Sequence, residues 1–354
     1  MTKKLLPTVI GMILAGGVAV VQADVQVMGH IDESINYIDG KSSPYVDKGD
    51  TETRFICTTC SVGFKGSEDL GNGLKALFFL DWQYDINQST GLTGRDQYLG
   101  LGGNFGTVKV GTTSTVYKSH GAMIDPGYRT VAQMRDVGLQ SGLHSGKGAS
   151  GQGRNTNVIR YDSPSWNGLK FGANYTVNPD SNNTQDDNGY GAGISYENGG
   201  ILVYADYLTN DSGGDDEAYQ LGGKYTLNNF SVFGQYEIDK GLITDDRTET
   251  LGQTNTGDQA DIWMAGASYA MGNNLIYAAY GQGDKAKTRD NTVVTGAPPL
   301  PATNQVVADK YESMEIVGIH NFSKRTLAYT GFVYVNPDDS SNINHYTLGV
   351  KHTF

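Results

Sequence analysis

The last stretch of the chain, Tyr346-Thr-Leu-Gly-Val-Lys-His-Thr-Phe354, alternates between two kinds of residue. Tyr346, Leu348, Val350 and Phe354 share one parity, on which His352 is the single polar residue. Successive side chains of a β-strand point to opposite faces, so this period of two predicts a strand with one apolar and one polar face. Such a strand suits either a soluble β-domain or a barrel in a membrane, and periodicity alone does not choose between them.

Residues 1–23 have the features of a secretory signal. Lys3 and Lys4 precede a mostly apolar run, and Ala23 is a small residue where signal peptidase cuts. We therefore expect a mature chain that begins at Asp24, in preference to a single membrane anchor, because no stop-transfer flank follows. Removing this segment takes away two lysines and no acid, which changes the formal charge from −12 to −14.

The composition excludes several classes of protein. No later stretch approaches the ~18 apolar residues of a spanning helix. The mean hydropathy of −0.39 argues against a helical membrane protein but not against a barrel, whose strands are polar at every second position. The 48 glycines and 22 tyrosines suit short strands, tight turns and aromatic side chains at an interface. The acidic balance argues against nucleic-acid binding, which needs a basic face.

We interpret residues 24–354 as one all-β domain, because no linker divides them. Short turns alternate with longer polar connections, and the count is about sixteen strands, as in an antiparallel barrel. An even number of strands places both termini at the same end. The expected strands are 24–37, 53–66, 74–85, 95–102, 107–112, 154–162, 169–177, 189–198, 201–209, 217–227, 230–238, 259–270, 274–282, 309–321, 325–335 and 344–354.

Three of these strands have an apolar face that is easily read. In a membrane barrel such a face points to lipid, and the opposite, polar face points to a wet lumen. We therefore expect the following three sets to point outward: Phe171, Ala173, Tyr175 and Val177; Tyr219, Leu221, Gly223, Tyr225 and Leu227; and Leu327, Tyr329, Val333 and Val335.

Four motifs follow one another along the chain: GFKGSEDLGNGLKA at 63–76, YLGL at 98–101 with FGTVKVG at 105–111, RNTN at 154–157 with RYDSP at 160–164, and GVKHTF at 349–354. The terminal phenylalanine resembles the end of outer-membrane barrels, where it is part of an assembly signal. The four motifs together with this residue resemble the general porins of Gram-negative bacteria. The similarity is greatest to the proteobacterial group that includes the neisserial porins, and it covers essentially the whole mature chain.

The resemblance implies a homotrimeric sixteen-stranded barrel in the outer membrane of a Gram-negative bacterium, in contact with outer-membrane lipid and lipopolysaccharide. It implies passive diffusion of ions and small hydrophilic solutes, with no cofactor. It also implies that the third external loop folds inward and narrows the pore. Thr113–Gly153 is the longest connection and occupies that place in the order, and loops of such length are usually functional.

In the family, basic residues on the barrel wall face acids on the inward loop, and this charged ring sets selectivity. By resemblance we expect the basic wall to consist of Lys65, Arg95 and Arg154, and the acidic side to consist of Asp125 and Asp136.

The chain departs from the family pattern at two wall positions. Ser61 and Thr112 stand where relatives carry arginine, and the inward loop holds two acids against four bases, which are Lys118, Arg129, Arg135 and Lys147. External loops are acidic, for example at Asp180, Asp186 and Asp187, and acidic loops concentrate cations at the mouth. The acidic mouth therefore favours cations and the more basic inward loop favours anions, so the two act in opposite directions on ion selectivity.

Cys57 and Cys60 are the two cysteines of the chain. Because an exported protein meets an oxidising compartment, we expect a disulfide. A redox-active pair would need a thioredoxin-like βαβ context, and a metal site would need more ligands. Residues three apart in a strand point to opposite faces, so the bond requires a bend or bulge there.

The sequence offers no catalytic set and no metal-ligand motif, so we expect no enzyme. The leading hypothesis is a general diffusion porin. Ser61, Thr112 and the basic loop favour a channel specific for an anion or organic acid as an alternative. Adhesion through the acidic external loops is a third possibility of another class.

Overall fold

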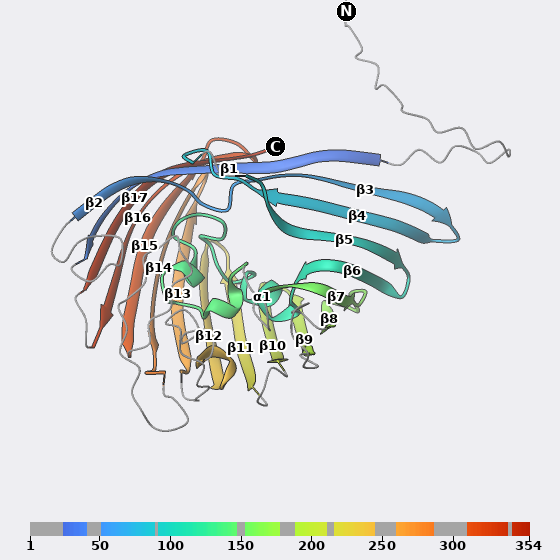
Figure 1. Cartoon of the computed structure of the whole chain (residues 1–354). Coiled ribbons are helices and arrows are strands. Elements are labelled where there is room, and N and C mark those ends of the chain that lie inside the picture. The colour runs from blue at the N-terminus through green and yellow to red at the C-terminus, as the bar shows by residue number, and fades with distance from the viewer. Residues whose placement is uncertain are drawn as a thin grey trace, which may run out of the picture.

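The chain folds into a closed antiparallel sheet of seventeen labelled strands (Figure 1). This computed structural model describes residues 24–40, 51–88, 91–146, 153–177, 188–210, 216–244, 260–286, 310–338 and 342–354. The predicted signal, residues 1–23, lies outside these ranges and stays a prediction. The strands are β1 (Asp24–Gly40), β2 (Thr51–Cys57), β3 (Ser61–Gly71), β4 (Leu74–Gln83), β5 (Thr93–Gly103), β6 (Gly106–Ser114), β7 (Arg154–Asp162), β8 (Leu169–Thr176), β9 (Gly189–Asn198), β10 (Ile201–Asn210), β11 (Asp216–Leu227), β12 (Phe230–Lys240), β13 (Ile262–Met271), β14 (Asn274–Gly283), β15 (Tyr311–Asn321), β16 (Thr326–Pro337) and β17 (Ile343–Thr353).

The first and last strands close the ring. On one side, residues 30–40 of β1 pair with residues 343–353 of β17. On its other side β1 pairs with both β2 and β3, which lie end to end along it. Because β2 and β3 share one place in the ring, the seventeen labelled strands occupy sixteen positions. The predicted sixteen-stranded antiparallel barrel is confirmed.

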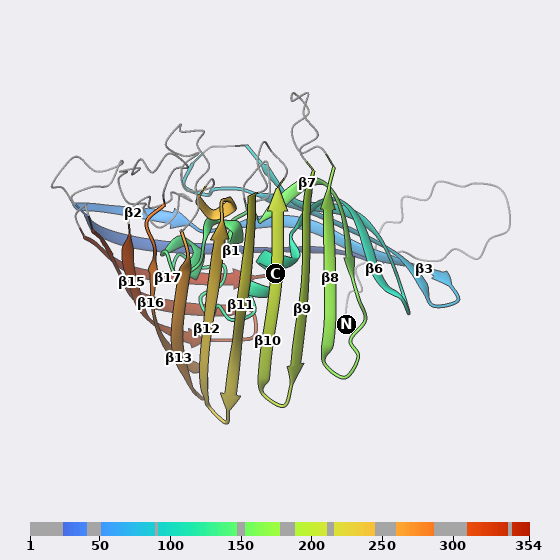
Figure 2. The ribbon, with the colours of Figure 1, turned by 90° about the horizontal axis from the view of Figure 1, so that it is seen from below.

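The short turns lie together at one end of the barrel. Figure 2 shows β8 to β13 side by side, with the short turns that join β9 to β10 and β11 to β12 below them. Asn228, in the turn between β11 and β12, has a φ of 53°, a left-handed conformation that asparagine tolerates better than most residues. Asp24 pairs with Ser67, and the backbone of Phe354 bonds to that of Gly29, so both described ends lie near this rim.

The alternation of β8 and β11 places apolar residues outside and polar residues inside. Leu221 is 64% exposed and Phe171 is also exposed, whereas Gln220 and Asn174, on the opposite faces of the same strands, are buried. An apolar outer band facing lipid requires this arrangement. The predicted outward faces of these two strands are therefore confirmed.

The predicted face of the strand at 325–335 is wrong. In β16, Tyr329 is 2% exposed, Val333 and Val335 are also buried, and Leu327 packs against the same group. These side chains point to the interior, where apolar residues of the long connection after β6 cover them. A dry patch of wall inside the barrel has the same period of two as a lipid-facing one, so the pattern could not distinguish them.

The connection between β6 and β7 lies inside the ring of strands (Figure 1). We call residues 115–146 the inward segment; it contains α1 (Val116–Gly121), η1 (Met134–Asp136) and η2 (Gly142–His144). The hydroxyl of Thr115 caps α1 by accepting from the backbone N–H of Lys118 at 3.2 Å. Across the lumen, Tyr277 Oη donates to the carbonyl of Ala132. No helix among the described residues is long and apolar enough to span a bilayer.

Candidate functional site

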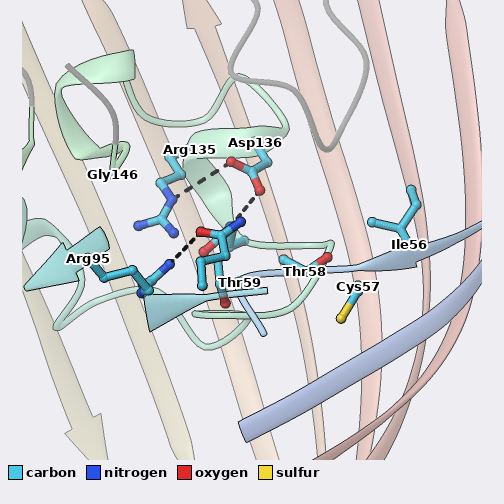
Figure 3. A pocket seen from close by; sticks show the side chains of 10 residues that line it. Ile56, Cys57, Thr58, Thr59, Arg95, Arg135, Asp136 and Gly146 are labelled. Carbon is cyan, nitrogen blue, oxygen red and sulfur yellow. Dashed lines mark hydrogen bonds and ion pairs between the residues drawn. The ribbon is translucent and has the colours of Figure 1, made fainter. Parts of the chain in front are cut away.

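A cavity lies between η1 and the wall formed by β4, β5 and the junction of β2 with β3 (Figure 3). We call it the eyelet. Its empty volume is about 630 Å³, part of which is open solvent. The residues that line it are Ile56, Cys57, Thr58, Thr59, Gln83, Arg95, Gln133, Arg135, Asp136 and Gly146.

Arg95 is fixed to the wall of the eyelet by its neighbours on β4. Its Nε donates to Asp81 Oδ2 at 3.0 Å, and its Nη1 donates to Gln83 Oε1 at 2.9 Å. The register of β4 against β5 shifts between Leu80 and Trp82. Such a bulge interrupts the alternation of faces, which lets the consecutive residues Arg95 and Asp96 both form interior contacts.

Arg154, at the start of β7, links the wall to the inward segment. Its Nε donates to Asp96, and its Nη1 donates to the carbonyl of Gly146 at 2.7 Å. A side chain at position 146 would collide with this guanidinium, since a Cβ there would lie 2.5 Å from Arg154 Nη1. Arg154 therefore touches the eyelet through Gly146 and does not line it.

Arg135 and Asp136 reach the eyelet from η1 and lie beside each other there (Figure 3). Arg135 Nε is 3.7 Å from Asp136 Oδ1, and its Nη1 donates to the carbonyl of His144 at 2.9 Å. The Arg135 guanidinium also lies 5.4 Å from the centre of the Tyr128 ring, within the range of a cation–π contact.

Asp125 holds the backbone of the inward segment. Its two carboxylate oxygens accept from the N–H groups of Gly127, at 2.9 Å, and Met134, at 3.1 Å. It is 8% exposed and does not line the eyelet. Burial raises the pKa of Asp125 to about 7. Burial likewise raises the pKa of Asp136 above its ordinary value.

The residues predicted for the constriction thus divide into three groups. Arg95 and Asp136 line the eyelet together, and Arg154 adjoins it. Asp125 lies within the inward segment, bonded to its backbone and away from the lining of the eyelet. Lys65 lies in a separate cavity with Asp24, Gln26, Phe79 and Tyr98, toward the short turns. Their role in selectivity stays a prediction.

Two carboxylates that pair with the basic residues were not anticipated from the sequence. Asp81 binds Arg95, and Asp96 binds Arg154. A charged residue within a barrel strand has to face the lumen, so their presence inside expected strands was a usable signal. The bulge that lets Arg95 face inward beside Asp96 has no comparable signature.

More bases adjoin the eyelet than the predicted set contains. Arg154 and Arg129 lie close enough to Arg95 to interact with it electrostatically, and Lys118 lies near Arg154 and Arg135. Burial lowers the pKa of Lys118 well below its ordinary value, with a smaller contribution from the two arginines. Lys118 Nζ has no hydrogen-bond partner among the described residues.

Cys57 and Cys60 form a disulfide at the junction of β2 and β3. Ser61, which replaces the expected arginine, lies next to it and has its hydroxyl 3.3 Å from His30 Nδ1. The wall of the eyelet here consists of threonine hydroxyls and not of a guanidinium. The described residues contain no group of three or more His, Cys, Asp or Glu side chains that could hold a metal ion.

A closed barrel with a polar interior, an inward segment and a charged eyelet defines a transmembrane β-barrel channel. A family model described as Gram-negative porin matches residues 8–340. The chain therefore belongs to the Gram-negative porin family, and it is an outer-membrane porin.

Relatives and solved structures agree with this placement. The chain is 26% identical over an alignment of 394 positions to the major outer membrane protein P.IB of Neisseria sicca, with 98% of this chain and 99% of that protein covered. An anion-selective porin from Comamonas acidovorans superposes with a TM-score of 0.71 at 21% identity, covering 94% of this chain and all of that one. The trimer form of OmpT, an outer-membrane protein of Vibrio cholerae, gives a TM-score of 0.65 at 12% identity, covering 94% and 99%.

Proposed function

We propose that this porin is a passive diffusion channel whose eyelet favours small hydrophilic anions, with no catalytic step and no cofactor. The observation that carries the proposal is the balance of charge at the eyelet. Four arginines, at 95, 129, 135 and 154, surround it or adjoin it, and arginine stays charged at every relevant pH.

The acids near the eyelet offset these arginines only in part. Asp81 and Asp96 are committed to ion pairs with Arg95 and Arg154. Burial raises the pKa of Asp125 to about 7, which weakens its negative charge near neutral pH, and Asp136 lies 3.7 Å from Arg135. Arg129 takes part in none of the ion pairs found among the described residues. A net positive ring at a narrow, poorly screened point attracts anions.

The test is the reversal potential of the folded protein in a planar bilayer under a potassium chloride gradient. We expect the sign of an anion-preferring pore, and we expect the double variant Arg129→Gln/Arg135→Gln to shift it toward cations. Lys170→Gln, at the short-turn end of β8, is the matched control and should leave it unchanged. A cation-preferring wild type, or a double variant identical to the wild type, would contradict the proposal.

We propose a homotrimer as the working assembly. The proposal is supported by membership of the porin family and by the fold shared with a protein whose solved structure is a trimer form. Conductance that increases in groups of three equal steps, together with a trimer mass in mild detergent, would support it. Single independent steps from a monodisperse monomer would count against it.

Contact with lipopolysaccharide, a strictly solute-specific channel and adhesion are less well supported. The acidic external loops on which adhesion would depend, such as 178–187 and 245–258, lie outside the described residues. The alternative of a solute-specific channel is favoured by the unpartnered Nζ of Lys118 beside Arg154. Saturable block of the chloride current by one organic acid, and not by others of its size, would favour it over general diffusion.

A further inference from the structure

The junction between β2 and β3 contains one residue more than the strand it faces. His30 pairs with Ser61, and Glu33 pairs with Cys57. Two residues of β1, 31 and 32, therefore lie opposite three residues, 58 to 60. This is a bulge of one residue, and one extra residue exchanges the two faces of a strand.

Because of this exchange, β2 and β3 both direct side chains into the lumen at the positions that face the buried residues of β1. In β2, Ile56 pairs with the buried Ser34 and lines the eyelet. In β3, Ser61 pairs with the buried His30 and bonds to it. Without the extra residue, one of the two halves would turn its lumen-facing side chains toward lipid.

The bulge itself forms a hoop, residues 57–60, that makes up part of the eyelet lining. Thr58 and Thr59 both line the cavity, and Figure 3 shows them across from Arg135 and Asp136 of the inward segment. The hydroxyl of Thr59 is 3.1 Å from His30 Nε2, so the hoop is also tied to the wall.

Several bonds hold the hoop in a conformation that its sequence does not favour. Thr59 has a φ of 52°, which is costly for a β-branched residue. The Cys57–Cys60 disulfide closes the hoop on either side of it, and Cys60 is fully buried. The N–H of Thr58 donates to the carbonyl of Asp32 at 3.1 Å, and the N–H of Tyr84 donates to that of Cys60 at 3.1 Å.

We propose that this disulfide-closed hoop limits the size of solute that the eyelet admits, so that solute size selection depends on the Cys57–Cys60 bond. The inference rests on the channel function but not on its ion preference. The inward segment bounds the eyelet on one side, and the hoop is a part of the opposite wall that departs from the regular strand path. Opening the bond releases the restraint on Thr59, and the hoop relaxes toward the wall.

The test uses uncharged sugars of increasing size, because their passage does not report charge selectivity. Liposome swelling would be measured for the wild type and for the double variant Cys57→Ser/Cys60→Ser. We expect the size cutoff of the double variant to move to larger sugars while its reversal potential stays the same. An unchanged cutoff in a folded double variant would overturn the proposal.

Two further measurements keep the test decisive if the double variant folds poorly. Thr58→Ala/Thr59→Gly retains the disulfide, suits the positive φ and removes the side chains that line the eyelet, so it should also raise the cutoff. Reduction of the folded wild type by a dithiol, which yields two cysteine thiols and the cyclic disulfide of the reagent, should do the same. The dithiol should not affect the double serine variant. If the folded threonine variant and the reduced wild type both keep the original cutoff, the hoop does not limit solute size.

Discussion

Tyr117 donates its phenolic hydrogen to Glu237 Oε2 at 2.9 Å, which joins the start of the inward segment to β12. The same fully buried carboxylate accepts from the backbone N–H and the hydroxyl of Ser141, near the other end of the segment. Gln235 Nε2 donates to it as well, at 2.9 Å. Both ends of the inward segment are therefore attached to the barrel through one side chain.

Replacing Glu237 by alanine should release the inward segment. The donors of Tyr117, Ser141 and Gln235 would lose their acceptor, and each buried donor left unpaired costs about 1–3 kcal/mol. We expect a larger and noisier single-channel conductance. The exposed Glu197→Ala, on β9, serves as the control and should behave as the wild type. A quiet channel of normal conductance from Glu237→Ala would show that other contacts hold the segment.

The apolar side of the inward segment offers a second way to release it. Met134 is fully buried in a cluster that also contains Val131 and Leu139 of the segment and Val333 of the wall. Met134→Asp places a carboxylate in this dry cluster, where a charge without a partner is strongly unfavourable. We expect raised conductance and faster protease cleavage within the segment. Met134→Leu nearly conserves volume, costs less than about 1.5 kcal/mol, and should change neither property.

The attachment of the segment should weaken as the pH rises. The pKa of Asp125 is raised from its ordinary 3.8 to about 7, so the native protein favours the neutral acid. The stability gained in this way is complete below pH 3.8 and is lost as the pH rises through about 7. Current noise from the segment should therefore be greater at pH 8 than at pH 5. Asp125→Asn, whose amide cannot ionise, should give the same noise at both values, and a pH effect that persists in this variant would assign it to another group.

Closure of the barrel should depend on the absence of a side chain at Gly29. A Cβ at this position would lie 2.3 Å from the carbonyl oxygen of Ser61 and 2.6 Å from Cζ of Phe354. Gly29→Ala should therefore lower the yield of folded barrel, measured as the band whose gel mobility changes on heating. Gly318→Ala is the matched control, because nothing lies within 4 Å of a Cβ there. Equal yields would mean that β1 and β3 move apart to accept the methyl group.

Much of the fold could be predicted because each strand carries its own local signals. Alternating residues such as Tyr219 to Leu227, and a turn such as Asn228-Asn229, define a hairpin without reference to the rest of the chain. The face of β16 could not be predicted in this way. Whether Val333 meets lipid or the inward segment depends on a segment about two hundred residues away in the chain.

The candidate site was predictable only in part. Arg95 and Asp136 were found through the family pattern, and the structure brings both to the eyelet. Asp96 faces inward with Tyr98 and Gly100 by the alternation of β5, whereas Arg95 faces inward through the bulge, and bulges leave no period in the sequence. Asp125 resembled any other acid of the loop. Its two backbone acceptor bonds follow from the fold of the segment and not from the residue type.

The pairing of β1 with β17 also sets the timing of assembly. Residues 30–40 find one of their two neighbours only in residues 343–353, almost the whole length of the chain later. Until the last strand has been synthesised and exported, the first strand has an edge of unpaired N–H and C=O groups, and each of these costs several kcal/mol in hydrocarbon. The N-terminal hairpins therefore gain nothing by entering the membrane early. The chain has to wait in water, with its sheet edges exposed to other chains, and insert when the ring can close.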